Sequence, residues 1–156
     1  METGEKRLCG QQAVWNYEEE NGLLTIQGVG AMEDYTEPEQ VPWNTLIQEI
    51  KTVVIRNGIT TVGDYAFAGC SSLQEVTLPG SVEIVGVFSF KGCTGLREIV
   101  IPEGVRVLAS KAFQFCSALK KVYLPSTLID VDMRAFGKCE SLEEVFYQGS
   151  EEIGRA

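Results

Sequence analysis

The most regular feature of the chain is a 23-residue spacing of apolar side chains. Phenylalanine recurs at this interval, and cysteine follows three residues after each phenylalanine: Phe67, Phe90, Phe113 and Phe136, then Cys70, Cys93, Cys116 and Cys139. Leucine and β-branched positions keep the same phase before and after these residues, and Val53 and Ile55 supply one more strand in front of the first complete unit. Residues 53–147 therefore form one repeat array, and a fixed period of this length predicts a solenoid.

Each unit is expected to contain a strand, an extended return and a short turn. Glu75 and Thr77 alternate with Val76 and Leu78, so one strand face points inward and the other outward. The segment 66–73 has apolar residues three apart, which predicts one helical or 3-10 turn. A single unit cannot bury its apolar side, so neighbouring units must stack. The pattern predicts an α/β repeat solenoid with a parallel sheet.

The first third of the chain lacks the repeat and is expected to form a β-rich cap. Asn21-Gly22 is a favoured two-residue hairpin turn, and strand-like segments flank it at 15–17 and 23–26. We therefore predict an N-terminal cap over residues 1–50. A solenoid of about four 23-residue repeats and a C-terminal end follows over 51–156, and the two parts share one core.

The repeat unit resembles the BspA-like branch of leucine-rich repeats, whose units read A-F-x-x-C-x-x-L-x-x-(V/I)-x-(L/I)-P. The first segment, with Cys9-Gly10, Trp15 and Pro42-Trp43, is similar to the cap that precedes such repeats in secreted proteins of gut-type bacteria. The resemblance implies a right-handed solenoid in an extracellular or cell-surface bacterial protein. It also implies an adhesin-like role, in which the solenoid engages host or microbial macromolecules.

Composition narrows the possible functions further. The 156 residues have a net charge of −9 and no concentrated basic patch, which disfavours binding to nucleic acid or to anionic membrane surfaces. No apolar stretch approaches the roughly 18 residues that a membrane span requires, so we expect no membrane insertion. Histidine is absent, and with it the side chain most often used for acid–base catalysis near neutral pH. We expect no enzymatic activity and no cofactor.

The four in-register cysteines could suggest a metal site or disulfides. Zinc sites use close pairs such as C-x-x-C, whereas a 23-residue spacing places one thiol in each turn of the solenoid. Equivalent side chains on successive turns lie about 4.8 Å apart, beyond the roughly 4.5 Å between Cβ atoms of a relaxed disulfide. We predict buried free thiols that pack as small apolar side chains. Cys9 lies outside the array and is not fixed by this reasoning.

Two further patterns have an ordinary and a functional interpretation. Gly28-x-Gly30 could open a dinucleotide loop, but Glu33 stands where the third glycine belongs and prolines replace the required helix. A turn in the cap is favoured. Glu33, Asp34, Glu37 and Glu39 could bind calcium or act as paired carboxylates, but they lack the spacing of a calcium loop. A solvated surface loop is favoured for them.

The outward strand positions are the candidate binding site, because core packing does not dictate them. An aromatic and aliphatic column is expected beside a mostly acidic one, and the candidate residues are Val54, Glu75, Thr77, Glu98, Val100, Lys121, Tyr123, Glu144 and Phe146. Such a stripe rimmed by charge is typical of a contact surface for a protein or glycan partner, with Tyr123 and Phe146 as anchors. The chain could also self-associate. Alternatively, these residues are simply good strand formers, or Phe146 packs under a C-terminal cap, and the chain is a structural spacer with no ligand.

Overall fold

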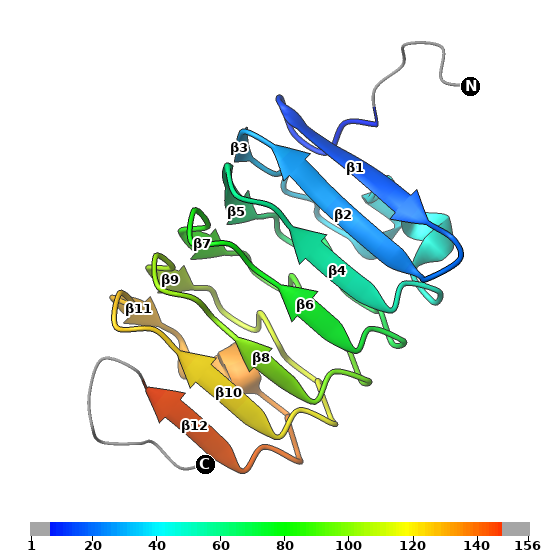
Figure 1. Ribbon diagram of the computed structural model, residues 1–156. Coiled ribbons are helices and arrows are strands. Elements are labelled where there is room, and N and C mark those ends of the chain that lie inside the picture. Colours follow the sequence, from blue (N-terminus) through cyan, green and yellow to red (C-terminus); the bar gives the residue numbers. More distant parts are fainter. Residues whose placement is uncertain (1–6, 148–156) are drawn as a thin grey trace.

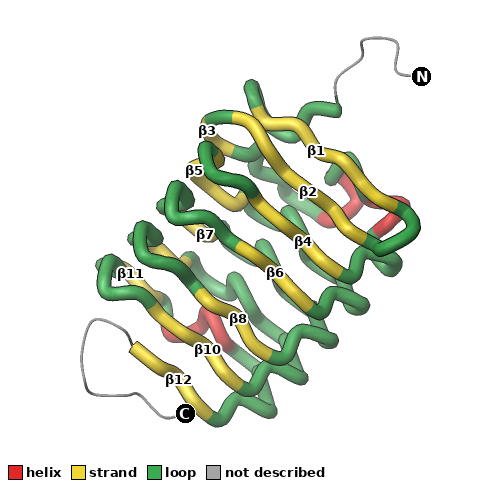
Figure 2. Tube along the Cα trace, viewed as in Figure 1, coloured by secondary structure: helices red, strands yellow, loops and turns green. Residues whose placement is uncertain are grey.

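The computed structural model describes residues 7–147, which form flat turns stacked along one axis (Figure 1). Each repeat contributes a strand to a front sheet, a short strand to a rear sheet and a turn segment that returns to the front (Figure 2). The front strands, in stacking order, are β1 (Ala13–Glu18), β2 (Leu23–Gly28), β4 (Thr52–Ile55), β6 (Glu75–Thr77), β8 (Glu98–Val100), β10 (Lys121–Leu124) and β12 (Glu144–Tyr147). The rear strands are β3 (Gly30–Ala31), β5 (Ile59–Val62), β7 (Ile84–Val85), β9 (Val107–Leu108) and β11 (Asp130–Val131).

The predicted parallel-sheet repeat solenoid is confirmed, with less helix than the α/β class implies. Within residues 7–147 the helices are the short 3-10 segments η1 (Pro38–Gln40), η2 (Asn44–Leu46) and η3 (Met133–Phe136). The turn segment is a 3-10 helix in the last repeat alone. In the first repeat it is a series of turns, in which the N–H groups of Cys70 and Leu73 donate to carbonyls three residues earlier. The rear strands pair in parallel throughout, so the expected extended return is in fact a second sheet.

The cap begins with the antiparallel hairpin of β1 and β2. Its register pairs Glu18 with Leu23, so the connection has four residues, 19–22, and the expected two-residue turn is wrong. Gly22 has a φ of 65° in this connection, a conformation that glycine adopts without steric cost. The second hairpin strand then pairs in parallel with β4, with Leu24 opposite Val53. The parallel stack therefore starts inside the cap.

The repeats are tied together on three sides by backbone hydrogen bonds. The front and rear ladders account for two sides, and the turn segments form a third, in which the N–H groups of Phe67, Phe90 and Phe113 each donate to the next turn at 2.7 Å. The front ladder alone is interrupted, between β6 and β8, which divides the front sheet into two pieces. Across this interruption the rear sheet and the turn segments continue.

A column of stacked aromatic rings runs through the buried core, which extends as one cluster from Cys9 to Ala135. The rings of Phe67, Phe90, Phe113 and Phe136 follow one another at centroid distances of 5.2, 5.1 and 5.6 Å. Trp43 of the cap extends the column at 5.5 Å from Phe67, and its Nε1 donates to the carbonyl of Ala66 at 2.9 Å. The cap therefore covers the first repeat with a ring of its own, whose N–H is satisfied.

The repeat cysteines form a second column beside the rings, and all five cysteines of the chain are free thiols. The Sγ atoms of Cys93, Cys116 and Cys139 donate to the carbonyls of the phenylalanines in the preceding turns, at 3.3, 3.2 and 3.1 Å. Burial raises the pKa of the Cys70 thiol to about 12. Burial, and then the negative charge of Glu33, raise the pKa of Cys9 to about 12 as well. Reactive thiolate is thus suppressed near neutral pH.

The raised thiol pKa values predict that stability falls in alkaline solution. The unfolded chain loses thiol protons near pH 9, whereas folded Cys70 and Cys9 keep theirs until about pH 12, so unfolding is favoured as pH rises between these values. The midpoint of urea unfolding is expected to drop between pH 8 and about pH 10. In denaturant without reductant, a thiol reagent should count five groups, and a lower count would reveal a disulfide.

Glycine and hydroxyl residues alternate at one position of the rear turns, at Gly58, Ser81, Gly104 and Thr127. The hydroxyl of Ser81 accepts from the N–H of Gly58 at 3.0 Å and donates to the carbonyl of Ile59 at 2.7 Å. Thr127 makes the same pair of bonds to Gly104 and Val105, at 3.0 and 2.7 Å. The side-chain bonding pattern therefore repeats every second turn, although the backbone repeats every turn.

Candidate functional site

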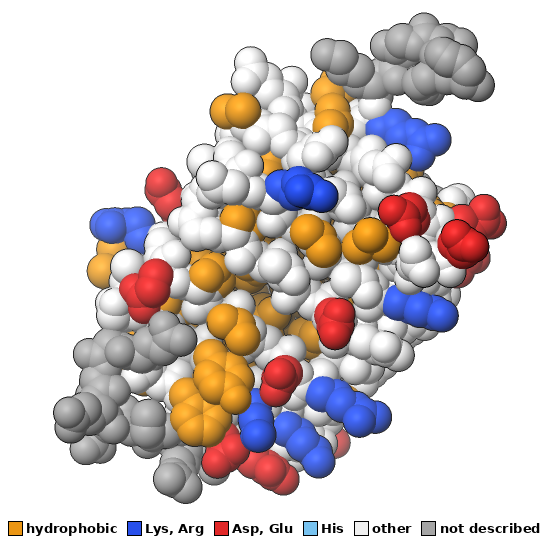
Figure 3. Space-filling model, in the orientation of Figure 1, with side chains coloured by type: hydrophobic (Ala, Val, Ile, Leu, Met, Phe, Trp, Pro, Cys, Tyr) orange, Lys and Arg blue, Asp and Glu red, His pale blue; other side chains and the backbone are white. Residues whose placement is uncertain are grey.

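The predicted site residues all lie on the front strands. The strand register places Val54 beside Thr77 and aligns Val100, Tyr123 and Phe146 on three neighbouring strands. The charged positions form a second column beside the apolar one, in which Glu98 and Glu144 flank Lys121 on the neighbouring strands. The alternation inferred from the sequence thus brings these side chains together in space. Figure 3 shows hydrophobic side chains gathered over β10 and β12, with charged side chains beside them.

An aromatic pair is the most distinctive feature of this face. The rings of Tyr123 and Phe146 stack at a centroid distance of 4.9 Å and an interplanar angle of 14°. Both side chains are half-buried, and the neighbouring Val100 is 48% exposed. Aromatic cross-strand pairs stabilise a sheet, and they also present a rigid apolar surface with little entropy to lose on binding.

The interruption of the front ladder divides the candidate site. Val54 and Thr77 belong to the sheet piece that includes the cap hairpin, whereas Val100, Tyr123 and Phe146 belong to the three-stranded piece β8, β10 and β12. The aromatic half is therefore held by its own continuous hydrogen-bonded ladder. We treat this half as the principal part of the site.

Basic residues that the sequence reasoning missed lie beside the glutamates. Glu75 and Glu98 line a hollow of about 640 Å³ together with Lys51 and Arg97. Lys51 and Arg97 each directly precede a front strand. The alternation of inward and outward residues applies only within the strands, so it did not identify these two as site residues. The rim of the front face at β4, β6 and β8 is thus of mixed charge.

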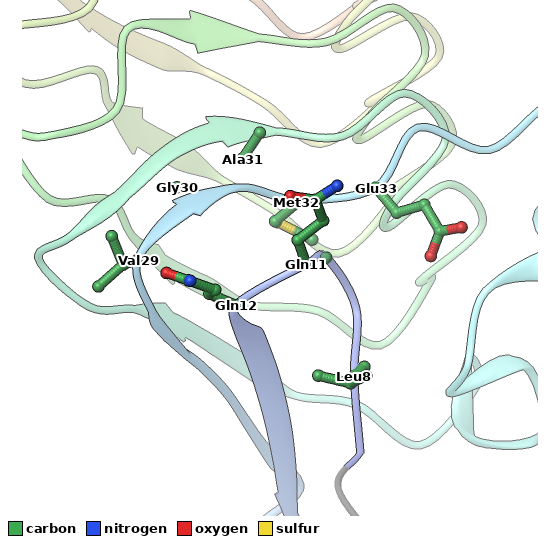
Figure 4. Close-up of a pocket in the computed structure, with 9 residues that line it drawn as sticks. Leu8, Gln11, Gln12, Val29, Gly30, Ala31, Met32 and Glu33 are labelled. Atoms are coloured by element: carbon green, nitrogen blue, oxygen red, sulfur yellow. The ribbon is translucent and has the colours of Figure 1, made fainter.

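A second hollow, of about 720 Å³, lies at the edge of the cap (Figure 4). Its wall combines exposed apolar side chains, with Val29 61% and Leu8 48% exposed, and the amides of Gln11 and Gln12. Gly28 and Gly30 belong to this part of the cap, with φ values of 126° and 91°. Gly28 ends β2 and Gly30 begins β3, with no helix after them, so the favoured interpretation of Gly28-x-Gly30 as a turn agrees with the structure.

One acidic residue of the cap loop, Asp34, links the cap to the first repeat through a hydrogen bond. Oδ1 of Asp34 accepts a hydrogen bond from the backbone N–H of Asp64 at 2.9 Å. Asp64 in turn accepts from the N–H of Val87 at 2.9 Å, so two carboxylates brace successive turns. Burial raises the pKa of Asp64, the bond from Val87 lowers it, and the charge of Asp34 raises it. Among residues 7–147, no group of three or more His, Cys, Asp or Glu side chains could hold a metal ion.

Comparison with protein families identifies a leucine-rich repeat model. The model described as "BspA type Leucine rich repeat region" matches residues 46–156 with six copies. A comparison with curated proteins found no match. In the described part of the chain, no helix is both long and apolar enough to cross a membrane.

Several solved structures of bacterial leucine-rich repeat proteins are similar to the chain. One from Eubacterium ventriosum has 23% identity and a TM-score of 0.66, with 89% of this chain and 42% of that chain covered. A leucine-rich cell surface protein from Faecalibacterium prausnitzii has 21% identity and a TM-score of 0.72, with 89% and 38% covered. One from Bacteroides ovatus has 34% identity and a TM-score of 0.60, with 63% and 25% covered. The chain thus spans about two fifths of the length of the first two, and at their identities they show the fold alone.

Proposed function

The chain belongs to the family of BspA-type leucine-rich repeat proteins, and from this we propose that it is a non-catalytic recognition module. Its front strand face would bind a protein or a glycan. The repeat fold is suited to interaction because it presents an extended sheet whose outward residues are free of packing demands. The solved Faecalibacterium protein is named a cell surface protein, and the Pneumococcal vaccine antigen PcpA also has the fold, at 24% identity and a TM-score of 0.51. We extend the surface location to this chain as part of the proposal.

The stacked pair of Tyr123 and Phe146 is the observation that carries the proposal. Two aromatic rings on the outer face of a sheet, next to a half-exposed valine and within a charged rim, have the composition of an interface hot spot. A neighbouring glutamate and lysine, Glu144 and Lys121, would set the orientation and charge preference of the partner. Five strands span only roughly 20 Å, enough for a modest contact area.

The test is an array of glycans and host extracellular proteins probed with the purified chain and with its Tyr123→Ala/Phe146→Ala variant. We expect a ligand whose affinity falls about 30-fold or more in the variant, the loss that corresponds to a hot spot of about 2 kcal/mol. Phe115→Ala is the matched control, because it removes another exposed aromatic, 45% accessible, from the turn side of the molecule.

Each outcome of the array has a distinct meaning. Binding that is lost in the double variant and kept in Phe115→Ala supports recognition through the front face. Binding that survives the double variant places the ligand elsewhere and overturns the proposed site. A complete absence of ligands favours the alternative, a structural spacer that displays other parts of a larger protein.

A further inference from the structure

A third hollow, of about 400 Å³, lies between the cap loop and the turn segments of the first two complete repeats. Its lining comes from Thr36, Glu37, Pro38, Tyr65, Ala68, Gly69, Lys91 and Gly92. No front-strand residue is part of it, so it is separate from the candidate face described above. Its lining combines an aromatic ring, a cation, a carboxylate and a hydroxyl around a floor of small residues.

The aromatic wall is held in a conformation that side chains rarely adopt. Tyr65 lines the hollow, and its ring lies 5.0 Å from that of Phe88, at an interplanar angle of 35°. Both residues have left-handed backbone conformations, with φ values of 63° and 60°, and Lys111 in the next turn has one of 61°. These three positions are 23 residues apart, so the left-handed conformation belongs to the repeat backbone and places the side chains at equivalent points of successive turns.

Two ammonium groups lie near the ring of Phe88, which contacts Tyr65 but does not itself line the hollow. The Nζ atom of Lys91 lies 4.9 Å from the ring centroid of Phe88, and that of Lys111 lies 5.7 Å from it. Over residues 7–147, the ion pair within 4 Å is the one between Arg134 and Asp132, so neither lysine is paired with a carboxylate. In a chain with a net charge of −9, the unpaired ammonium group of Lys91 at this hollow is a place where an anionic group would be stabilised.

The hollow is open because two turns have glycine where later turns have large side chains. Gly69 and Gly92 have φ values of 83° and 76°, and the equivalent Phe115 and Lys138 adopt 65° and 62°. A Cβ atom on Gly92 would approach only Gly69, at 3.9 Å, and one on Gly69 would meet Ile47 at 3.7 Å. Packing therefore does not require glycine at either position, and the missing side chains leave the space in front of Tyr65 and Lys91 free.

We propose that this hollow is a binding site for an acidic sugar, a hexuronate residue of a glycan chain. The ring of Tyr65 would stack on the C–H face of the sugar, and Lys91, the cation that lines the hollow, would pair with the sugar carboxylate. Thr36 and Glu37 face the same space and can donate to and accept from the sugar hydroxyls. An aromatic platform with a few convergent polar groups is the usual composition of a small-molecule site.

The experiment titrates the intact chain with a galacturonate trimer and, separately, with the neutral galactose trimer, by calorimetry at low salt. Binding of the acidic trimer is expected, with the neutral one at least tenfold weaker. Lys91→Gln should weaken binding of the acidic trimer about tenfold, the loss expected for one charge-assisted contact. Gly92→Phe should abolish binding, because it fills the hollow with the side chain that the same backbone position already has in Phe115.

Controls separate this site from charge effects and from the front face. Lys138→Gln removes a lysine of the turn side that does not line the hollow, and Tyr123→Ala/Phe146→Ala alters the other site, so both should bind the acidic trimer normally. If Gly92→Phe does not fold, Tyr65→Leu replaces it as the variant that loses binding. The proposal is overturned if the acidic trimer does not bind, if the neutral trimer binds equally well, or if Lys138→Gln weakens binding as much as Lys91→Gln.

Discussion

Replacing Phe113 with alanine is expected to lower the free energy of unfolding by about 3–5 kcal/mol, the range measured for large-to-small changes at buried aromatic positions. Phe113 is fully buried and is stacked on both sides, with Phe90 at 5.1 Å and Phe136 at 5.6 Å. Its loss would leave a cavity that two rigid hydrogen-bonded turns cannot close by collapsing. Urea unfolding followed by circular dichroism measures the change.

A graded control distinguishes the loss of ring volume from a general sensitivity of the core. Phe113→Leu keeps most of the side-chain volume and should cost roughly 1–2 kcal/mol. Phe115→Ala, two residues away and 45% exposed, should cost well under half of the Phe113→Ala effect. Equal losses in Phe113→Ala and Phe115→Ala would contradict the assignment of the ring column as the central stabilising element.

Replacing Gly104 with alanine is expected to be a strongly damaging conservative change on the rear side, with a loss of about 3 kcal/mol. Gly104 has a φ of 114°, which L side chains rarely adopt, and an added Cβ atom would lie 2.1 Å from the carbonyl oxygen of Gly80. The alanine can be accommodated only by moving the backbone, which would also disturb the bond from the Gly104 N–H to Thr127.

Gly80→Ala is the matched control for this prediction. It adds the same methyl group in the neighbouring turn, where the nearest atom outside the adjacent residues is the Glu103 carbonyl oxygen at 3.3 Å and φ is not left-handed. A loss of at most about 1 kcal/mol is expected there. Thermal and urea unfolding of the two variants side by side would decide the matter, and similar losses would show that the close approach at Gly104 relaxes easily.

The inward-facing residues made the fold predictable from the sequence. Each turn packs against nearly the same neighbours, so Phe67 and Cys70 have equivalents in every later turn and the period is visible directly. The rear sheet was harder to predict, because its strands have two to four residues and alternate too briefly to be told from an extended return. Trp43 lies 24 residues before Phe67, one more than the repeat length. The repeat therefore did not predict that its ring would stack on Phe67, because that position is set by the fold of the cap.

Of the two candidate sites, the front face could be predicted from the sequence and the hollow beside Tyr65 could not. The columns that end in Tyr123 and Phe146 follow from strict alternation along parallel strands, which needs only the sequence. The hollow between the cap loop and Tyr65 joins segments about thirty residues apart, and its openness depends on glycines that break the pattern of Phe115 and Lys138. The four-residue hairpin connection and the interruption of the front ladder depend on backbone hydrogen bonds that residue types alone do not specify.

The alternation of Gly58, Ser81, Gly104 and Thr127 bears on how such an array can be shortened or lengthened. Deleting one 23-residue unit, residues 81–103, would place Gly104 where Ser81 now lies. Because glycine has no hydroxyl, the Gly58 N–H and the Ile59 carbonyl would both lose their hydrogen-bond partner. Deleting 46 residues, 58–103, would instead leave Gly104 in the place of Gly58, with Thr127 still bonded to it. For protein engineering, the interchangeable module of this solenoid is therefore a pair of turns.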